Sequence, residues 1–366
     1  MSKYRQDQPL LFQIETPRNI DTEMQEARDN IKQYIIDNPG KNINVAFSCG
    51  KDSLLTALLV REVLDDLHID KRINLNVFYS GYEKKEAAVW FKYLRETMTG
   101  VQFRVCKIHI SHSYGVCTLG RGRFPITAYN VKWCNQLKRG GLDLLQRTSD
   151  GLTFVGVRAS ESIRRAKDIK ENGVIRGTGS ARVCRPIGNV STCNVWKYLE
   201  RNVHNIGVNY DRLVDYYGND TRDGCWVCYA QKYPNGENDL RSAITLRWRI
   251  YSDRDRVNQG LYTYPDGVNR IRTDVLRERY NEVLELEKKY NEYLLTDMHK
   301  KYIFEFWNIY ENVTSSRGKK GLLYKEDFLR DYFNGSYKML YPELFDDALV
   351  KIGDRYLYRK YIIEQD

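Results

Sequence analysis

The stretch Ser48-Cys49-Gly50-Lys51-Asp52-Ser53 decides the fold class of this chain. The apolar run Ile43–Phe47 before it is typical of a short buried strand, and Leu54–Val60 after it is typical of a helix with an apolar face. A tight Ser/Gly loop between a strand and a helix start presents backbone N–H groups to an anion, and the helix dipole favours negative charge there. With a lysine and two serine hydroxyls added, the stretch predicts a pyrophosphate-binding loop.

The spacing within this loop separates it from the Walker type of phosphate loop. A Walker loop has four residues between its glycines and continues Gly-Lys-Ser/Thr, an order that is missing around Lys51. The alternative without a ligand is a polar turn that joins a strand to a helix. The small residues, the lysine and the following helix favour nucleotide binding. Cys49 is either a tolerated small residue or a reactive thiol beside the nucleotide, and we expect the first.

Strands and helices alternate along the chain after the loop. Residues Ile73–Tyr79, Val101–Val105 and Thr153–Arg158 are typical of strands, and Glu83–Met98 is typical of a helix between two of them. This alternation predicts an α/β fold with a doubly wound parallel sheet and a mostly helical C-terminal extension. Ligands of such sheets bind beyond the carboxyl ends of the strands, where the loop and Ser80-Gly81 would converge.

Charge and composition indicate an anionic partner. The 366-residue chain carries a net charge of +10 and contains 28 tyrosines. Basic and aromatic side chains together suit phosphates and unpaired bases, so nucleic acid or nucleotides alone are expected as partners. The alternative is a compositional habit unrelated to binding, and charge does not separate DNA from RNA.

Compartment and domain organisation follow from the same composition. No apolar run approaches the length of a membrane span and Met1–Thr16 is polar, so we expect a cytoplasmic protein without a membrane partner. Eight cysteines in such a chain are expected to be reduced thiols or metal ligands. Composition shifts predict an N-terminal helical arm (1–39), an α/β domain (40–208), a cysteine-containing and helical segment (209–300) and a small C-terminal extension (301–366).

Four motifs occur in order along residues 40–230. They are the loop at Ser48–Ser53, Trp133-Cys134 with Leu137-Lys138, Gly156–Ser162 with Arg164-Arg165-Ala166, and Arg185-Pro186-Ile187 followed by Val195-Trp196. The first resembles the S-G-G-K-D-S "PP-loop" of ATP pyrophosphatases, with Cys49 at the position of the first glycine. The set resembles the phosphoadenylylsulfate (PAPS) reductase-like family. The resemblance implies an adenine nucleotide α-hydrolase-like fold and cleavage of ATP between its α- and β-phosphates.

The resemblance also implies roles for particular residues around ATP and Mg²⁺. The loop residues Ser48, Cys49, Gly50, Lys51, Asp52 and Ser53 would hold the β,γ-pyrophosphate, and Asp52 would either position Mg²⁺ or orient Lys51. Arg158 at a strand end would meet the α-phosphate or a second anion, and with Lys51, Asp52 and Ser53 it forms the expected catalytic set. Arg164 and Arg165 are either further phosphate ligands or solvated helix charge. Glu161 is expected to orient arginines, and Gly81 is expected to line the nucleotide site.

The cysteines suggest a metal site. Gly224-Cys225-Trp226-Val227-Cys228 resembles an element of the DndC and SspD proteins of DNA phosphorothioation, and its C-x-x-C spacing fits a metal or a cluster. Cys134 and Cys184 are the expected further ligands of a 4Fe–4S cluster or of Zn²⁺. DndC-like proteins carry another cysteine shortly before this element, whereas residues 217–222 contain none. A thioredoxin-like redox pair of Cys225 and Cys228 is the alternative.

The function that this resemblance implies is ATP-dependent sulfur transfer to nucleic acid, with DNA expected rather than tRNA. A cysteine desulfurase or another sulfur donor, and other subunits of a modification complex, are the expected partners. PAPS or adenylylsulfate reduction is an alternative, although the last cysteine of the chain is Cys228 and no C-terminal cysteine follows. Transfer-RNA thiolation is another. A non-catalytic ATP-binding subunit of a DNA-modification or defence complex would fit Cys49 and the Ser80-Gly81 that replaces an acidic D-T-G.

Overall fold

The computed structural model describes residues 18–122, 132–177, 182–217, 225–226, 238–248, 261–263, 269–271, 273–312 and short segments between 340 and 365. These residues form a seven-stranded sheet with the order β11-β3-β2-β1-β4-β6-β5. Its strands are β1 (Asn42–Ala46), β2 (Ile73–Tyr79), β3 (Val101–Ile108), β4 (Gly151–Val155), β5 (Ile175–Arg176), β6 (Val183–Cys184) and β11 (Tyr361–Gln365). The strands from β3 to β6 are parallel, and β11 and β5 add antiparallel edges. The predicted α/β fold with a mainly parallel sheet is therefore confirmed.

The central strands are buried because helices cover the sheet on both faces. Strand β1 lies between β2 and β4, with Ile43 opposite Ile73 on one side and Leu152 on the other. Leu75 and Val77 of β2 join the core beneath α2 (Lys51–Asp66). Side chains alternate along a strand, so Phe78, which follows Val77, faces the other way, where a Cβ on Gly141 of α4 would lie 2.7 Å from its ring. Helices α2 and α4 (Lys132–Arg147) thus sandwich the sheet.

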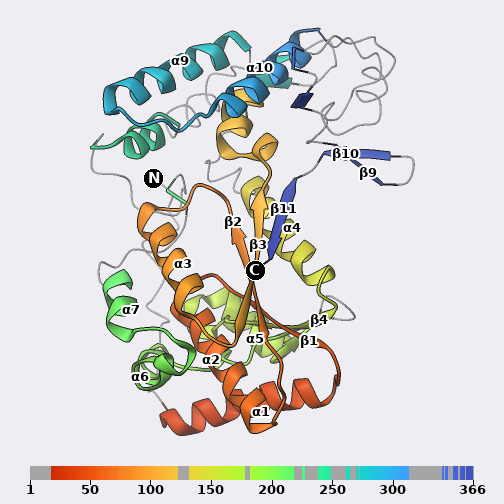
Figure 1. Cartoon of the computed structure of the whole chain (residues 1–366), viewed down its shortest axis with the longest axis vertical. Helices are drawn as coiled ribbons and strands as arrows, with labels where there is room; N and C mark the ends of the chain where they lie inside the picture. Colours follow the sequence, from red (N-terminus) through yellow and green to blue (C-terminus); the bar gives the residue numbers. More distant parts are fainter. Residues whose placement is uncertain are drawn as a thin grey trace.

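The remaining helices of the α/β part complete this sandwich. They are α1 (Ile20–Ile36), α3 (Lys85–Thr97), α5 (Ile163–Asn172), α6 (Thr192–Asn202) and α7 (Tyr210–Tyr217). Helices α1, α2 and α6 pack on one another at one end of the molecule, as Figure 1 shows. Ser191 caps α6 by accepting the Asn194 N–H.

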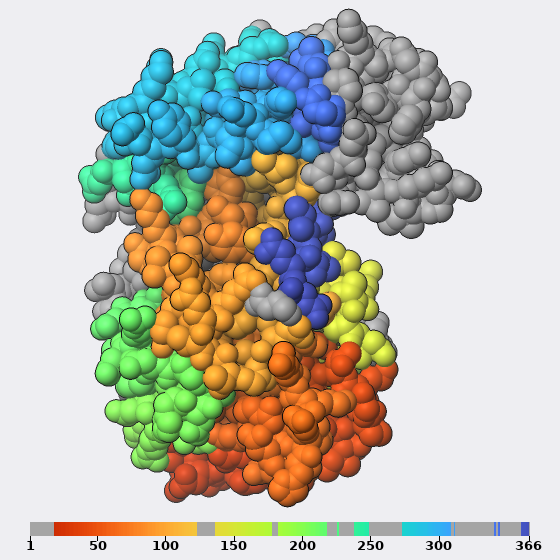
Figure 2. Space-filling model, viewed as in Figure 1, coloured from red at the N-terminus to blue at the C-terminus, as the bar shows by residue number. Residues whose placement is uncertain are grey.

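A second hydrophobic core lies at the opposite end of the molecule (Figures 1 and 2). Helices α9 (Thr273–Tyr290) and α10 (Asp297–Asn312) and the helical residues 240–248 surround it. The short helical segments Ile110–His112 and Val116–Gly120, which follow β3, pack against α10 and connect the two cores. Two antiparallel ribbons complete the description, β7 (Leu261–Thr263) with β8 (Asn269–Ile271) and β9 (Leu349–Ile352) with β10 (Arg355–Tyr358).

The ends of the chain contribute to the α/β layers. Helix α1, from the predicted N-terminal arm, buries Met24 and Ile31 in the first core. Strand β11, from the predicted C-terminal extension, pairs with β3 from Tyr361 opposite Ile108 to Gln365 opposite Arg104. Both segments therefore share the layers of the domain predicted at residues 40–208. None of the described helices has the length and hydropathy that a membrane span needs.

Candidate functional site

The predicted phosphate loop lies at the point where the strand order of the sheet reverses. Strand β1 lies between β2 and β4, so the loops after β1 and β4 are neighbours at the carboxyl edge of the sheet, where a ligand crevice is expected. Open α/β sheets bind their ligands at such switch points. A Cβ on Gly156, just after β4, would lie 2.6 Å from the carbonyl oxygen of Asp52. Only a glycine lets the two loops approach this closely.

The backbone of the loop turns sharply at Cys49. This residue has φ = 62°, in the left-handed region that costs an L-residue about 1–2 kcal/mol and that glycine adopts freely. The conformation explains why the related PP-loop pattern has glycine here. Burial of the side chain and a hydrogen bond from Trp90 Nε1 to the Cys49 carbonyl oxygen (2.8 Å) hold the turn. The following Gly50 is the N-cap of α2 and supplies no side-chain cap, so the first-turn amides take their acceptors from outside the helix.

The two predicted serine donors have different surroundings. Ser53 is 3% exposed, and its hydroxyl donates to the Gly50 carbonyl oxygen at 2.8 Å. Ser48 is exposed, with its Oγ 3.3 Å from that of Ser53. The Ser53 hydroxyl therefore braces the loop from within, and Ser48 is the serine that the loop presents on its surface.

A chain of charges connects the two sides of the crevice through Asp52. Its Oδ2 lies 2.9 Å from Lys51 Nζ and its Oδ1 lies 2.6 Å from Arg158 Nε. Arg158 is 2% exposed and also donates to Ser160 Oγ and Thr192 Oγ1, both at 2.8 Å. Two cations share one carboxylate, so the cluster keeps a net positive charge beside the loop amides. Of the two roles expected for Asp52, these contacts fit the orientation of Lys51 and Arg158.

Glu161 and the two arginines of α5 lie next to Arg158. The Arg158 N–H donates to Glu161 Oε2 at 3.0 Å, and the Glu161 carboxylate forms an ion pair with Arg165 one helical turn later. Glu161 thus contacts the backbone of Arg158 and the side chain of Arg165, so its ion pair with an arginine side chain is the one on α5. Arg165 is half-buried by this contact, whereas Arg164 is exposed on α5.

The turn after β2 brings Cys225 to the same edge of the sheet. Glu83 Oε1 accepts from both the N–H and the hydroxyl of Ser80 at 2.7 Å, and Gly81 adopts φ = 78°. The Trp226 N–H donates to the Tyr82 carbonyl oxygen at 2.9 Å, which pairs residues 225–226 with this turn. Cys225 Sγ lies 3.2 Å from Ser80 Oγ. A half-buried thiol therefore lies beside the turn that follows β2.

Of the three other predicted metal ligands, Cys184 is the one whose side chain the structure describes. Cys184 is fully buried in the first core, on β6, and burial raises the pKa of its thiol to about 12. Cys225 instead packs against the second core. The Cys134 side chain and Cys228 lie outside the described residues. Among the described residues no three His, Cys, Asp or Glu side chains gather as a metal site, and the four-cysteine site stays a prediction because two of its members lie outside those residues.

Sequence reasoning missed the residues that approach the loop from distant helices. Tyr217, the last residue of α7, accepts the Lys51 N–H at 2.7 Å across 166 positions of sequence. Thr192 on α6 and Trp90 on α3 reach the site in the same way. The segment around Tyr217 stands out only as rich in Asp, Tyr, Gly and Asn, which does not reveal the contact.

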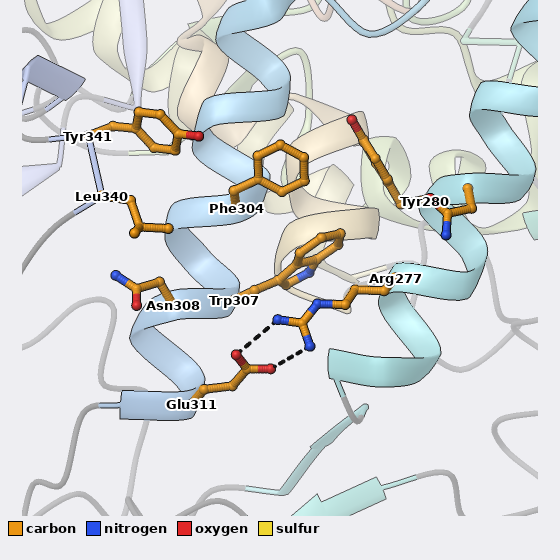
Figure 3. Close-up of a pocket in the computed structure, with 9 residues that line it drawn as sticks. Arg277, Tyr280, Phe304, Trp307, Asn308, Glu311, Leu340 and Tyr341 are labelled. Atoms are coloured by element: carbon orange, nitrogen blue, oxygen red, sulfur yellow. Dashed lines mark hydrogen bonds and ion pairs between the residues drawn. The ribbon is translucent and has the colours of Figure 1, made fainter.

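A separate pocket lies between α9 and α10, away from the phosphate loop (Figure 3). It measures about 480 Å³, and aromatic rings of Tyr280, Phe304, Trp307 and Tyr341 line it. Arg277 and Glu311 form a two-bond ion pair at one end, with 2.9 Å between NH1 and Oε1. The pocket belongs to the second core and shares no residue with the crevice at β1 and β4.

Comparison with known proteins assigns the chain to a family. Residues 42–230 match the phosphoadenosine phosphosulfate reductase domain, and this match covers more than half of the chain. The chain therefore belongs to the phosphoadenosine phosphosulfate reductase domain family, and its loop and sheet are those of the PP-loop superfamily.

Individual relatives are distant. An uncharacterized protein of Methanocaldococcus jannaschii is 28% identical to this chain over 245 residues. The matched residues cover 60% of this chain and 44% of that relative, so the chain spans less than half of the relative's length. Among solved structures, the U34-tRNA thiolase NcsA from Methanococcus maripaludis with its 4Fe–4S cluster is 14% identical (75% and 80% of the two chains, TM-score 0.38). NMN synthetase from Francisella tularensis is 12% identical (76% and 98%, TM-score 0.35).

Proposed function

We propose that this protein cleaves ATP between the α- and β-phosphates and uses the adenylate to activate an oxygen of a nucleic acid for replacement by sulfur. The observation that carries the proposal is the loop at the switch point of the sheet, with Lys51, Asp52 and Arg158 joined in one charge chain. The first-turn amides of α2 and the Lys51 ammonium group suit the leaving pyrophosphate. Arg158, held from the other side of the crevice, suits the charge that develops on the α-phosphate.

The acceptor in this proposal is DNA. The resemblance of the Gly224–Cys228 element to DndC and SspD proteins supports DNA phosphorothioation, and the net charge of +10 suits a polyanionic substrate. Cys225 supports the transfer of sulfur near the nucleotide because its thiol lies at the carboxyl end of β2, one strand away from the loop. Transfer RNA is the second acceptor to test.

The reaction balances in three steps. A non-bridging phosphate oxygen of the nucleic acid attacks the α-phosphorus of ATP, and pyrophosphate leaves. A persulfide sulfur, supplied by a cysteine desulfurase, attacks the activated phosphorus of the nucleic acid, and AMP leaves with the oxygen. A second thiol then reduces the sulfur–sulfur bond, which releases the phosphorothioate and leaves a disulfide on the donor. Lys51 and Arg158 would stabilise the phosphate charges in the first step, and Asp52 would keep both cations in position.

Incorporation of labelled sulfur tests this proposal. The protein, purified without oxygen, is incubated with ATP, Mg²⁺, a cysteine desulfurase and ³⁵S-cysteine, together with duplex DNA, single-stranded DNA or tRNA. We expect ATP-dependent label in DNA, lost in Lys51→Ala. Lys41→Ala is the matched control, because Lys41 pairs with Asp150 at the opposite end of β1. Label in tRNA alone would move the function to tRNA thiolation, and equal label in wild type and Lys51→Ala would contradict the proposed site.

A non-catalytic role has its own signature when the same mixtures are prepared with α-labelled ATP. A subunit that only binds ATP would retain labelled nucleotide and form no AMP with any acceptor. Reduction of PAPS, the remaining alternative, would appear as sulfite release from labelled PAPS in the presence of a dithiol reductant, which becomes a disulfide, and without nucleic acid. Each outcome names one function and excludes the proposed one.

A further inference from the structure

Tyr217 lies against the parts of the loop that suit a phosphate, which are the Lys51 amide, the Lys51 ammonium group and the surface of Gly50. Its hydroxyl accepts the Lys51 N–H at 2.7 Å, and its ring lies 5.7 Å from the Lys51 ammonium nitrogen. The hydroxyl also lies directly above Gly50, since a Cβ built there would be 2.8 Å from it. The amide, the glycine surface and the ammonium group of the loop therefore meet a single side chain.

Neighbouring rings hold Tyr217 in this place. We define the aromatic clasp as Trp90, Trp196, Tyr216 and Tyr217. Tyr217 meets Trp196 and Tyr216 edge-on at 5.3 Å, and Tyr216 stacks on Trp90 at 4.9 Å. Trp90 in turn donates to the Cys49 carbonyl oxygen, so the clasp fastens the end of α7 to the loop at two points.

A phosphate oxygen that accepts the hydrogen bond of the Lys51 N–H must occupy the position that the Tyr217 hydroxyl oxygen now holds. An N–H···O bond requires the acceptor at about 2.7–3.2 Å along the N–H direction, and two oxygens do not fit there together. We propose that Tyr217 competes with the nucleotide for the Lys51 amide, so that binding of pyrophosphate or ATP releases its hydroxyl from the loop. Tyr217 is thereby the residue that sets phosphate affinity at this site. The inference rests on the proposed nucleotide site but not on turnover or on the acceptor.

The affinity of Tyr217→Phe for pyrophosphate and MgATP tests this competition. Loss of the hydroxyl removes one hydrogen bond that the ligand must break, so we expect binding by the variant to tighten roughly three- to tenfold. Tyr216→Phe, which removes a hydroxyl from the neighbouring ring of the clasp, should bind within about twofold of wild type. Adenosine, which has no phosphate, should bind Tyr217→Phe and wild type equally. Calorimetric titration measures all three ligands.

Weaker or unchanged phosphate binding by Tyr217→Phe would overturn the inference, because the hydroxyl would then assist the nucleotide or only cap α2. The same holds if neither protein binds pyrophosphate. A measurement on the wild-type chain is independent of any variant. Iodination of Tyr217, followed by peptide mass spectrometry, should accelerate when pyrophosphate is added, with Tyr216 as the internal reference. Unchanged or slower labelling of Tyr217 would contradict its release. Failure of the proposed function would appear instead as absent AMP formation despite tightened binding.

Discussion

Replacement of Asp52 by asparagine tests the charge chain that joins the two sides of the crevice. The Asp52 side chain is 14% exposed, and it pairs with Lys51 and with Arg158, whose side chain is 3% exposed. Removing one partner of a buried ion pair costs about 3–5 kcal/mol because the remaining charge is left uncompensated. Asparagine keeps an oxygen for Arg158 Nε, and Arg158 keeps its bonds to Ser160 and Thr192. We therefore expect Asp52→Asn to lower the free energy of unfolding by about 2–3 kcal/mol.

The same helix provides the control. Asp65, in the last turn of α2, pairs with Arg61 but is 63% exposed, so Asp65→Asn should cost less than about 1 kcal/mol. Urea unfolding followed by circular dichroism gives both midpoints, and an unchanged slope would show that the compactness of the unfolded chain is the same. Equal midpoints for the two variants would refute the buried charge chain. A large loss in Asp65→Asn alone would refute the reasoning from burial.

Three further predictions concern backbone fit and pH. Cys49→Gly should stay within about 1 kcal/mol of the wild-type free energy of unfolding and keep pyrophosphate binding, because φ = 62° suits glycine. Cys49→Val should lose more than about 2 kcal/mol, because a β-branched residue is strained at this φ. Loss of activity in Cys49→Gly would instead indicate thiol chemistry. Gly156→Ala should lower the unfolding midpoint and weaken pyrophosphate binding by roughly tenfold or more, because the added Cβ would meet the Asp52 backbone. Pyrophosphate binding equal to that of wild type would contradict the close approach of Gly156 to the loop. Burial lowers the pKa of His299 to about 4 from 6.5, so the unfolded chain gains a proton first as pH falls. The free energy of unfolding of wild type should therefore fall by up to about 3 kcal/mol between pH 6.5 and 4, relative to that of His299→Asn. Parallel pH profiles of the two proteins in urea unfolding would refute this.

The sequence predicts the central fold well because its signals are local. The apolar run before Ser48, the small residues of the loop and the helix that follows are consecutive, and together they define β1, the loop and α2. The helix begins at Lys51 rather than at Leu54, because polar residues of the loop already form its first turn. Arg158 was expected near the nucleotide because it ends a strand, and the pairing of β4 with β1 brings it against Asp52 of the loop.

Contacts between distant segments could not be predicted in this way. Tyr217 reaches Lys51 across 166 positions and Ser80 reaches Cys225 across 145, and neither pair has a spacing signal. Strand β11 is half-exposed, so its sequence lacks the apolar run that marks a central strand, and its pairing with β3 is set by tertiary packing. The place of Cys184 in the first core likewise depends on the pairing of β6 with β4, which joins segments far apart in the sequence.

The products of ATP cleavage test the central claim most directly. Protein purified without oxygen is incubated with α-labelled ATP and Mg²⁺, alone and with duplex DNA, single-stranded DNA or tRNA, and the labelled products are separated by chromatography. Our account predicts labelled AMP with release of pyrophosphate, stimulated by DNA and abolished in Lys51→Ala. Labelled ADP, or bound ATP that yields no AMP with any acceptor, would contradict it.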